Sequence, residues 1–266
     1  MKYRNDIAFF ISEGKLKPLL DFPSDIAEKS DLAYEVIRVD RALPYFVLDH
    51  LNRLNFTLSQ KQLANISIDQ LLLQIYQIIE ANQIEEGNLK IVVSFQQTLA
   101  NPILYFIPHR YPSQQQYEGG VKTQLQYDTR KLPTAKFSDW KIRSAANRII
   151  DTEDVYETVL VNEQGELTEG SRSNLFFIQG EQLFTAPNAM VLAGITRDKI
   201  LEMAQQKQIK VNLVAVRSHE INEFDSCFLT GTSPGVLQIK KMNETNFKIN
   251  HPIYRTLHKG YNLYSI

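Results

Sequence analysis

The sequence predicts an α+β fold of two domains, and two observations carry this prediction. Short apolar segments typical of strands recur along the 266 residues with few helical patterns between them, which favours an α+β arrangement over a doubly wound sheet. One polar stretch, residues 112–120 (PSQQQYEGG), begins with a proline and ends in paired glycines, a composition typical of a linker. We therefore expect a smaller N-terminal domain at residues 1–116 and a larger C-terminal domain at residues 117–266.

The N-terminal half is expected to begin with a hairpin and two helices. Residues 32–39 (LAYEVIRV) and 45–48 (YFVL) have the composition of strands, and the segment VLDHLNRLN after them has a helical period. A second helix is predicted from Ser67, a possible N-cap, because Gln70 follows three residues later and apolar residues then recur at helical spacing. The segments 88–95 and 102–107 predict two buried strands.

The C-terminal half is expected to be rich in strands. Apolar or alternating segments predict strands at residues 121–127, 156–161, 173–178, 181–184, 210–216, 226–230 and 235–240. Helical patterns occupy residues 141–150 and begin again at Ile195 and at about Pro252.

Composition argues for a protein that acts on small molecules. The 29 Lys and Arg residues nearly balance the 30 Asp and Glu residues, for a formal charge of −1, so neither nucleic acid nor an anionic membrane is an expected partner. A single cysteine, Cys227, leaves no internal disulfide and suits a reducing cytosol. The N-terminal apolar run IAFFI is too short for a signal peptide. We expect a soluble cytoplasmic protein.

Three segments carry groups suited to an anionic ligand such as phosphate. In GITRDKILEMA (194–204), Thr196 can cap a helix whose first backbone N–H groups point outward. In FLTGTSPG (228–235), Thr232 follows a strand in a loop of hydroxyls and backbone amides. In HLNRL (50–54), Arg53 offers a forked set of donors and shares a helix face with His50. Each alone has an ordinary explanation, as a cap, a turn and a surface arginine.

Two further segments supply a carboxylate and an amine. Glu169 precedes a glycine and a small polar run that enters a strand in GELTEGSRSNLFFI, and Lys136 and Lys141 flank Trp140 in LPTAKFSDWKIRS. Together with the phosphate-type groups, they form the set that pyridoxal phosphate requires. Its aldehyde needs a lysine amine for a Schiff base, its ring nitrogen needs a carboxylate, and its phosphate needs cationic and N–H donors.

The order of six segments extends this interpretation. AYEVIRV, DHLNRL, LPTAK, LTEGSRSNLFFI, GITRDKI and FLTGTSPGVLQI, over roughly residues 30–266, resemble the class IV (fold-type IV) aminotransferases. This family includes branched-chain aminotransferases, D-amino acid aminotransferases and aminodeoxychorismate lyases. The resemblance implies two α/β domains with pyridoxal phosphate at their junction, and a homodimer in which each site borrows residues from the neighbour.

The resemblance also implies roles for individual residues. In the family the Schiff-base lysine precedes the ring-nitrogen glutamate by thirty-odd residues; Lys136 lies 33 residues before Glu169, whereas Lys141 lies only 28 before it. Lys136 is therefore expected to form the aldimine and to act as general base and acid, with Lys141 as the alternative. Glu169 would pair with the ring nitrogen. The phosphate ligands would be Arg53, the Ile195 backbone, Thr196 and Thr232.

The sequence leaves alternatives for the residues that contact the substrate. Tyr34 corresponds to a residue that lines the substrate side in D-amino acid aminotransferases, although a core tyrosine is an equal alternative. The substrate carboxylate could be held by Arg110, beside His109 in IPHRYP, or by Arg172, which could instead have a structural role.

Two departures from the family pattern affect the expected reaction. Asp139 and Trp140 stand where relatives carry an asparagine and often an aromatic residue or leucine, and Val36 stands where the lyases typically have threonine. The resemblance therefore implies an aminotransferase that moves an amino group between an amino acid and a 2-oxo acid through pyridoxamine phosphate. The alternative is a lyase that forms 4-aminobenzoate and pyruvate from 4-amino-4-deoxychorismate, and a fold relative without catalysis is disfavoured. No metal is expected.

Overall fold

The computed structural model describes residues 7–23, 26, 32–94, 101–109 and 111–264. The chain divides into two compact units, one of residues 1–110 and 135–140 and one of residues 111–134 and 141–266. The sequence placed the boundary between residues 116 and 117; the observed division falls after residue 110, and residues 135–140 return to the first unit. Within the described ranges, no helix is both long and apolar enough to cross a membrane.

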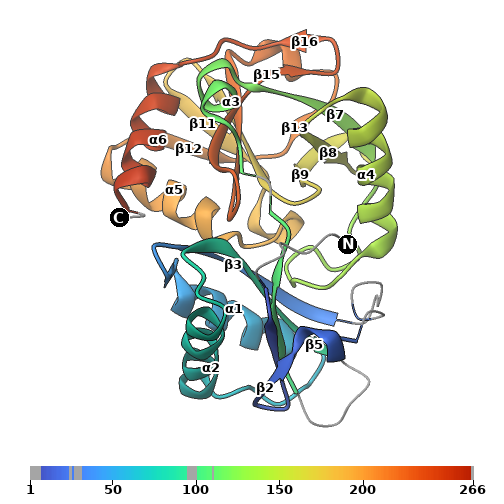
Figure 1. Cartoon of the computed structure of the whole chain (residues 1–266). Coiled ribbons are helices and arrows are strands. Elements are labelled where there is room, and N and C mark those ends of the chain that lie inside the picture. The colour runs from blue at the N-terminus through green and yellow to red at the C-terminus, as the bar shows by residue number, and fades with distance from the viewer. Residues whose placement is uncertain (1–6, 24–25, 27–31, 95–100, 110, 265–266) are drawn as a thin grey trace. The chain divides into compact units, whose positions relative to one another are not determined.

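The first unit is built on an antiparallel sheet of six strands (Figure 1). The strand order is β2-β1-β6-β5-β3-β4. The strands are β1 (Phe9–Ser12), β2 (Lys15–Pro18), β3 (Leu32–Asp40), β4 (Leu43–Pro44), β5 (Glu86–Ser94) and β6 (Ile103–Ile107). The longest pairing joins β3 to β5 over nine residues of each strand, from Leu32 opposite Ser94 to Asp40 opposite Glu86.

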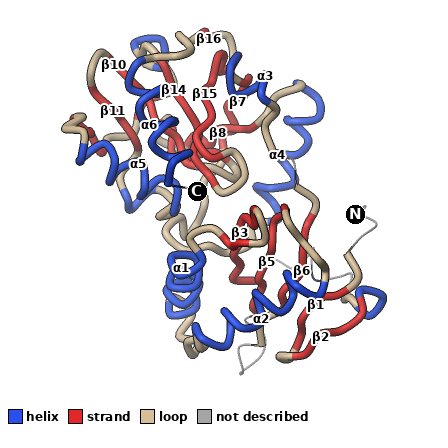
Figure 2. The backbone as a smooth tube through the Cα atoms, turned by 60° about the vertical axis from the view of Figure 1, so that its left-hand side comes forward, coloured by secondary structure: helices blue, strands red, loops and turns tan. Residues whose placement is uncertain are grey.

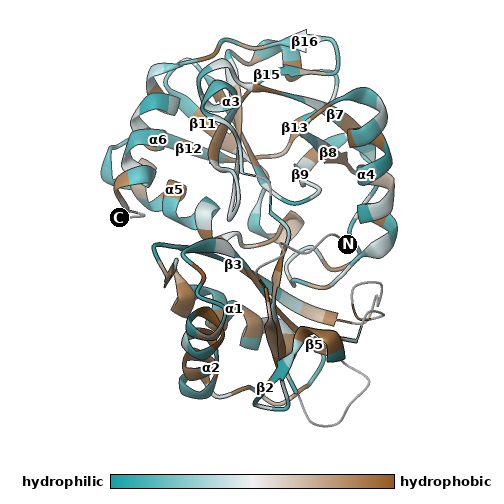
Figure 3. Ribbon diagram, in the orientation of Figure 1, coloured by the Kyte–Doolittle hydropathy of each residue, from teal (hydrophilic) through white to brown (hydrophobic). Residues whose placement is uncertain are grey.

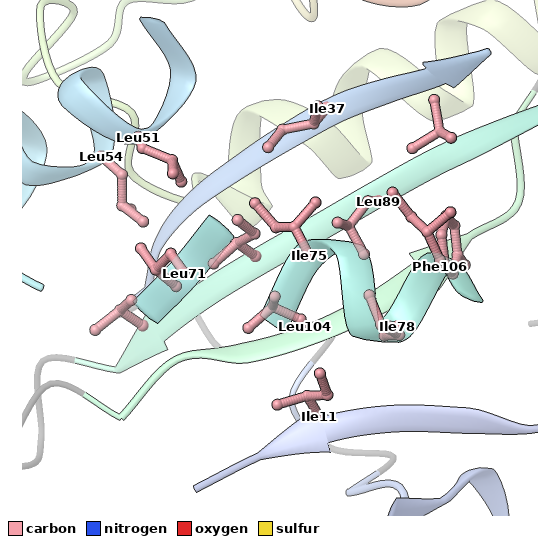
Figure 4. Packing of buried hydrophobic residues seen from close by; sticks show 14 of the residues in the cluster. Ile11, Ile37, Leu51, Leu54, Leu71, Ile75, Ile78, Leu89, Leu104 and Phe106 are labelled. Carbon is pink, nitrogen blue, oxygen red and sulfur yellow. The ribbon is translucent and has the colours of Figure 1, made fainter. Parts of the chain in front are cut away.

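Two helices cover one face of this sheet: α1 (Val47–Ser59) and α2 (Ile68–Ala81). Both are amphipathic, with hydrophobic and hydrophilic residues on different sides of the ribbon (Figure 3). Their apolar sides pack against alternate residues of the strands, as Figure 4 shows for the side chains around α2. The predicted N-cap of the second helix is confirmed, because Ser67 Oγ accepts the backbone N–H of Gln70 at 3.4 Å.

The edge of β3 is extended by a segment from much later in the chain. The Tyr34 N–H donates to the carbonyl of Lys136 at 3.1 Å, and the Ser138 N–H donates to the carbonyl of Leu32 at 2.9 Å. Ala33 and Phe137 form an antiparallel bridge between these bonds. Residues 136–138 therefore act as a short added strand, which fixes the backbone of Lys136 against β3.

The second unit contains a mixed sheet in which six strands close into a ring, β10-β14-β15-β7-β8-β9. The ring closes where β9 meets β10 through the single pairing of Glu169 with Asn174. Apolar side chains of these strands form the core of this unit. The strands are β7 (Val121–Tyr127), β8 (Glu157–Val161), β9 (Glu166–Gly170), β10 (Asn174–Gln179), β11 (Gln182–Thr185), β12 (Lys210–Leu213), β13 (Val216–Arg217), β14 (Ser226–Gly231), β15 (Gly235–Met242) and β16 (Thr245–Asn246).

The described part of the chain contains four further α-helices: α3 (Gln114–Gly119), α4 (Trp140–Glu153), α5 (Ile195–Gln206) and α6 (Pro252–Tyr264). Helices α5 and α6 lie side by side against β14 and β15 (Figure 2). The strands and helices together confirm the α+β class that the sequence predicted.

Three local predictions were wrong. Residues 45–48 are not a strand, because Phe46 takes a left-handed conformation and α1 begins at Val47; the short apolar run belongs to the helical period instead. Residues 112–120 are not an open linker, because Ser113 and Gln116 form a capping box that starts α3. Residues 210–216 are not one strand, because β12 pairs with β11 whereas β13 pairs with β9.

Candidate active site

In the first unit, the predicted Schiff-base lysine lies beside Tyr34 of β3, another predicted site residue, and is also joined to helix α1. The Lys136 backbone N–H donates to Thr57 Oγ1 on α1 at 3.2 Å, so the lysine is tied to the helix as well as to β3. Its amine nitrogen lies 5.0 Å from the centre of the Tyr34 ring. A lysine with a fixed backbone and an aromatic neighbour is suited to present one reactive amine.

A buried carboxylate holds Arg53 in place. Glu35 is fully buried on the face of β3 that α1 covers, and it accepts from Arg53 Nε and Nη2, each at 2.8 Å. His50 Nδ1 lies 2.7 Å from the same carboxylate. Because an ionised carboxylate only accepts, we assign the proton of the imidazole to Nδ1. This bidentate ion pair fixes the orientation of the Arg53 guanidinium.

Burial and charge act in opposite directions on this cluster. Burial would raise the pKa of Glu35, but the charge and hydrogen bonds of Arg53, with the hydrogen bond from His50, hold this pKa well below its usual value. Burial lowers the pKa of His50 below its usual value, although Glu35 opposes this change. The cluster therefore consists of an ionised carboxylate, a charged guanidinium and a neutral imidazole.

This cluster makes stability depend on pH. Both folded-state pKa values are depressed, so the unfolded chain binds protons that the folded chain does not, and stability falls as pH falls. We expect the melting temperature to fall as the pH is lowered past about 6.5, the ordinary pKa of histidine. It should fall further at the lower pH at which Glu35 also begins to bind a proton.

Thermal unfolding of the wild type, His50→Gln and His219→Gln between pH 8 and pH 4 tests this expectation. The His50→Gln variant should lose part of the slope between pH 7.5 and pH 5. The His219→Gln protein is the control, because the His219 side chain is 71% exposed and lies outside this cluster. Equal slopes in all three proteins would contradict the assignment of this pH dependence to His50.

In the second unit, Glu169 lies at the point where the strand ring closes. Its side chain is 5% exposed, and its two oxygens accept from Arg130 Nε at 2.9 Å, from Asn174 Nδ2 at 3.2 Å and from the Leu192 backbone N–H at 3.1 Å. Arg130 Nη2 also donates to the Ser171 carbonyl at 2.6 Å. A carboxylate with a cationic partner and two further donors is stabilised in its charged form.

The same network reaches the start of helix α5. Asn174 Nδ2 also donates to the Leu192 carbonyl at 2.9 Å, and Gly194 is the N-cap of the helix, without a side-chain cap. A Cβ atom on Gly194 would lie 1.9 Å from Asn174 Oδ1, so only glycine permits this close approach. The prediction that Thr196 caps the helix was wrong, because Gly194 takes that place and Thr196 lies inside the first turn.

The start of α5 fits an anionic group. Ile195 and Thr196 begin a helix of 12 residues, whose N-terminal N–H groups and dipole favour negative charge. Thr196 Oγ1 lies 3.3 Å from the Tyr261 hydroxyl. Two buried polar atoms, Arg197 Nε on α5 and Thr230 Oγ1 on β14, have no hydrogen-bond partner among the described residues. An anionic oxygen supplied by a ligand would satisfy donors of this kind.

The remaining predicted phosphate ligand lies in a tight turn. Thr232 follows Gly231 at the end of β14, and β15 begins at Gly235, which has a positive φ of 59°. Thr230, just before this turn, is the cross-strand neighbour of Asn174. Strand pairing thus brings the Thr232 turn to the same end of β10 as Asn174 and the start of α5.

The structure separates the other candidates. Arg172 is exposed, and its guanidinium donates to Asn147 Oδ1. Arg110 lies outside the described residues. Lys141 is exposed in the first turn of α4. Lys136, by contrast, is half-buried and joined to β3 and α1, which supports its choice over Lys141.

Comparison with known proteins shows the family of the chain. The model of the family "Amino-transferase class IV" matches residues 32–242, which is most of the chain. The chain belongs to the class IV aminotransferase family. It is an enzyme of this class, and its fold is the α+β fold of fold-type IV.

Three relatives illustrate the range of this family. A probable branched-chain-amino-acid aminotransferase of Thermotoga maritima is 26% identical over 88% of this chain and 85% of its own. A putative 4-amino-4-deoxychorismate lyase from Legionella pneumophila has a TM-score of 0.81, with 22% identity over 92% of this chain and 97% of the other. A branched-chain amino acid aminotransferase from Thermobaculum terrenum, solved in its PLP-form, has a TM-score of 0.83, with 18% identity over 97% of this chain and 94% of the other. The last two likenesses show the fold alone.

Several residues of this class IV aminotransferase were not found from its sequence. No local pattern in the sequence marks Arg130 or Asn174, because their role depends on their contact with Glu169. For Arg130 this contact spans 39 residues of the chain. Glu35 did leave a signal, because it is a carboxylate within an apolar strand. It lies two residues from both Ala33 and Ile37, so it shares the face of the strand on which these two face the core. A charged residue at such a position requires a partner, and here the partner is Arg53.

Proposed function

We propose that this enzyme is a pyridoxal phosphate-dependent aminotransferase that moves an amino group between an amino acid and a 2-oxo acid. The observation that carries the proposal is the network in which Glu169, Asn174 and Leu192 connect a charged carboxylate to the uncapped start of α5. A ligand with a protonated ring nitrogen at one end and a phosphate at the other fits this pair of groups. Family membership and the position of Lys136 support the same cofactor.

Each residue then has a distinct task. When bound, pyridoxal phosphate supplies a carbonyl carbon that bonds to amines and a ring that accepts electron density from the substrate α-carbon. Lys136 Nζ would hold the cofactor through its carbonyl carbon and would serve as the group that accepts and returns the proton of the substrate α-carbon. Glu169 would hold the ring nitrogen in its protonated form. Arg53, the Ile195 N–H, Thr196 and Thr232 are the residues that would bind the phosphate.

The Glu35 pairing fixes the orientation in which Arg53 would bind phosphate. Glu35 accepts from the Nε and Nη2 atoms of the guanidinium, each at 2.8 Å. A fixed guanidinium loses less conformational entropy on binding than a mobile one. Glu35 and His50 therefore serve as positioning residues.

The lyase is the second candidate, because a putative 4-amino-4-deoxychorismate lyase shares the fold. Val36 argues against the lyase, because lyases of the family typically have threonine at this position. We retain the transferase as the proposed function. A homodimer is proposed on family grounds, and light scattering of the purified protein would test it.

A turnover assay with and without a 2-oxo acid separates the two reactions. We expect amino donors to be consumed repeatedly only when a 2-oxo acid such as 2-oxoglutarate is present, because the amino group must leave the cofactor before the next cycle. A lyase would instead release 4-aminobenzoate and pyruvate from 4-amino-4-deoxychorismate alone. Sustained release without a 2-oxo acid would overturn the transferase proposal.

A further inference from the structure

A buried tyrosine of helix α6 contacts both segments of the second unit that are to bind the cofactor phosphate. The hydroxyl of Tyr261 lies 3.3 Å from Thr196 Oγ1, in the first turn of α5. Its ring lies against Gly235, where an added Cβ atom would be 3.3 Å from the ring carbon Cε1. Gly235 pairs with Gly231 across the turn that carries Thr232. One side chain therefore contacts the start of α5 and the strand that follows the Thr232 turn.

A glycine allows α6 to lie close to α5. Gly260 lies inside α6, although a glycine within a helix costs about 1 kcal/mol relative to alanine. A Cβ atom at this position would be 2.9 Å from Met203 Sδ on α5, so glycine permits the close approach of the two helices seen in Figure 2. Tyr261 is the next residue of α6, and the same approach places its hydroxyl beside Thr196.

The single proton of the Thr196 hydroxyl sets the direction of this contact when phosphate is bound. A hydroxyl donates one hydrogen bond and accepts up to two, whereas an ionised phosphate oxygen only accepts. Thr196 must therefore donate its proton to the phosphate, and the proton between the two hydroxyls must come from Tyr261. At 3.3 Å this contact is long for two hydroxyls. The charge of a bound phosphate would polarise both groups and strengthen it.

We propose that Tyr261 is a positioning residue for the cofactor phosphate. Its hydroxyl donates to Thr196 Oγ1 and so directs the Thr196 proton toward the phosphate. The proposal rests on the proposed function, since it takes Thr196 as a phosphate ligand. It gives Tyr261 a role through Thr196 and no direct contact with the cofactor. Tyr261 lies beyond residue 242, where the match to the family ends.

Binding of pyridoxal phosphate and of pyridoxal, which lacks the phosphate, tests this proposal without turnover. The full-length protein, freed of cofactor, is titrated with each compound, and the absorbance band of the lysine-bound form gives both affinities. The two compounds share the ring and the aldehyde, so the ratio of their affinities measures the contribution of the phosphate. The melting temperature establishes that each variant is folded.

The variants are Tyr261→Phe, Thr196→Val and the double variant, with Tyr254→Phe as the matched control. Tyr261→Phe keeps the ring that packs against Gly235 and removes only the hydroxyl. Tyr254 is 3% exposed on the same helix, and its hydroxyl donates to the Val236 carbonyl at 3.4 Å. The control therefore removes a buried tyrosine hydroxyl of α6 that is bonded to the backbone of β15.

The expected losses are specific to the compound that carries the phosphate. Tyr261→Phe should bind pyridoxal phosphate about three- to tenfold more weakly, as for loss of an ordinary hydrogen bond, and should keep its affinity for pyridoxal. Thr196→Val should lose about tenfold or more, because its hydrogen bond is to a charged group. The double variant should bind as Thr196→Val does, since Tyr261 acts through the Thr196 hydroxyl. Tyr254→Phe should keep both affinities.

Four results would overturn the proposal. An unchanged ratio of affinities in Tyr261→Phe would show that its hydroxyl does not serve the phosphate, and equal losses for both compounds would show a general structural effect. An unchanged ratio in Thr196→Val would remove the group through which Tyr261 acts. A full further loss in the double variant would show that Tyr261 acts independently of Thr196.

Failure of the proposed function has a different signature. If the wild type formed no lysine-bound band with either compound, the cofactor assignment would be lost, and the role of Tyr261 with it. A wild type that forms the band, with any of the four results above, would overturn only the role of Tyr261.

Discussion

Replacement of Lys136 by alanine is expected to abolish the covalent cofactor linkage and to reduce the rate of amino-group transfer by about 10³- to 10⁴-fold, the range typical for loss of a general acid–base group. The amine of this residue both binds the cofactor and moves the proton. Among the described lysines, only Lys136 has a backbone hydrogen-bonded to both β3 and α1 and an amine close to the Tyr34 ring. Borohydride reduction of the wild type, followed by peptide mapping, should place the label on Lys136.

Lys141→Ala is the matched control for this prediction. It removes an exposed lysine five residues later, in the first turn of α4, and should keep both the absorbance band and the wild-type rate. Label on Lys141, or full activity in Lys136→Ala, would contradict the assignment. Addition of a primary amine such as methylamine to Lys136→Ala should restore part of the proton transfer, because the missing group is itself an amine.

Glu169→Gln is expected to keep the lysine-bound cofactor band but to slow proton transfer at the substrate α-carbon by about 10²- to 10³-fold, the range typical for loss of one preorganised electrostatic group. In the wild type, the two carboxylate oxygens of Glu169 accept from Arg130, Asn174 and Leu192. In the Glu169→Gln variant an NH2 group replaces one of these oxygens, and it cannot accept a hydrogen bond from the donor that it faces. Arg130, with a side chain 16% exposed, would also lose its anionic partner.

The control is Glu166→Gln on the same strand. Glu166 is half-buried and accepts from Asn162 Nδ2 at 2.9 Å, so its replacement removes a carboxylate of β9 without affecting the network around Glu169. Stopped-flow measurement of the first half-reaction should separate the two variants. A Glu169→Gln protein that carries the band and reacts at the wild-type rate would show that the ring nitrogen does not depend on this carboxylate.

The largest misreadings of the sequence came from short segments. YFVL at residues 45–48 is equally compatible with a strand and with the first turn of a helix, and its assignment was decided by Leu51, Leu54 and Leu58, which extend the helical period into the core. The polar stretch 112–120 was mistaken for a linker because its helix depends on a capping box and on contacts such as that of Tyr117 with the Pro234 carbonyl.

The sequence by itself determined the α+β class, the capped helix at Ser67 and the family, because periodicity, capping and the order of short motifs are local properties of the chain. Only the tertiary structure decided which residues meet. The pairings of Glu35 with Arg53 and of Arg130 with Glu169 depend on strand register and on closure of the ring of strands. Strand register depends on the packing of all side chains on a face of a sheet, and these side chains come from segments far apart in the sequence. A short segment therefore does not specify the register.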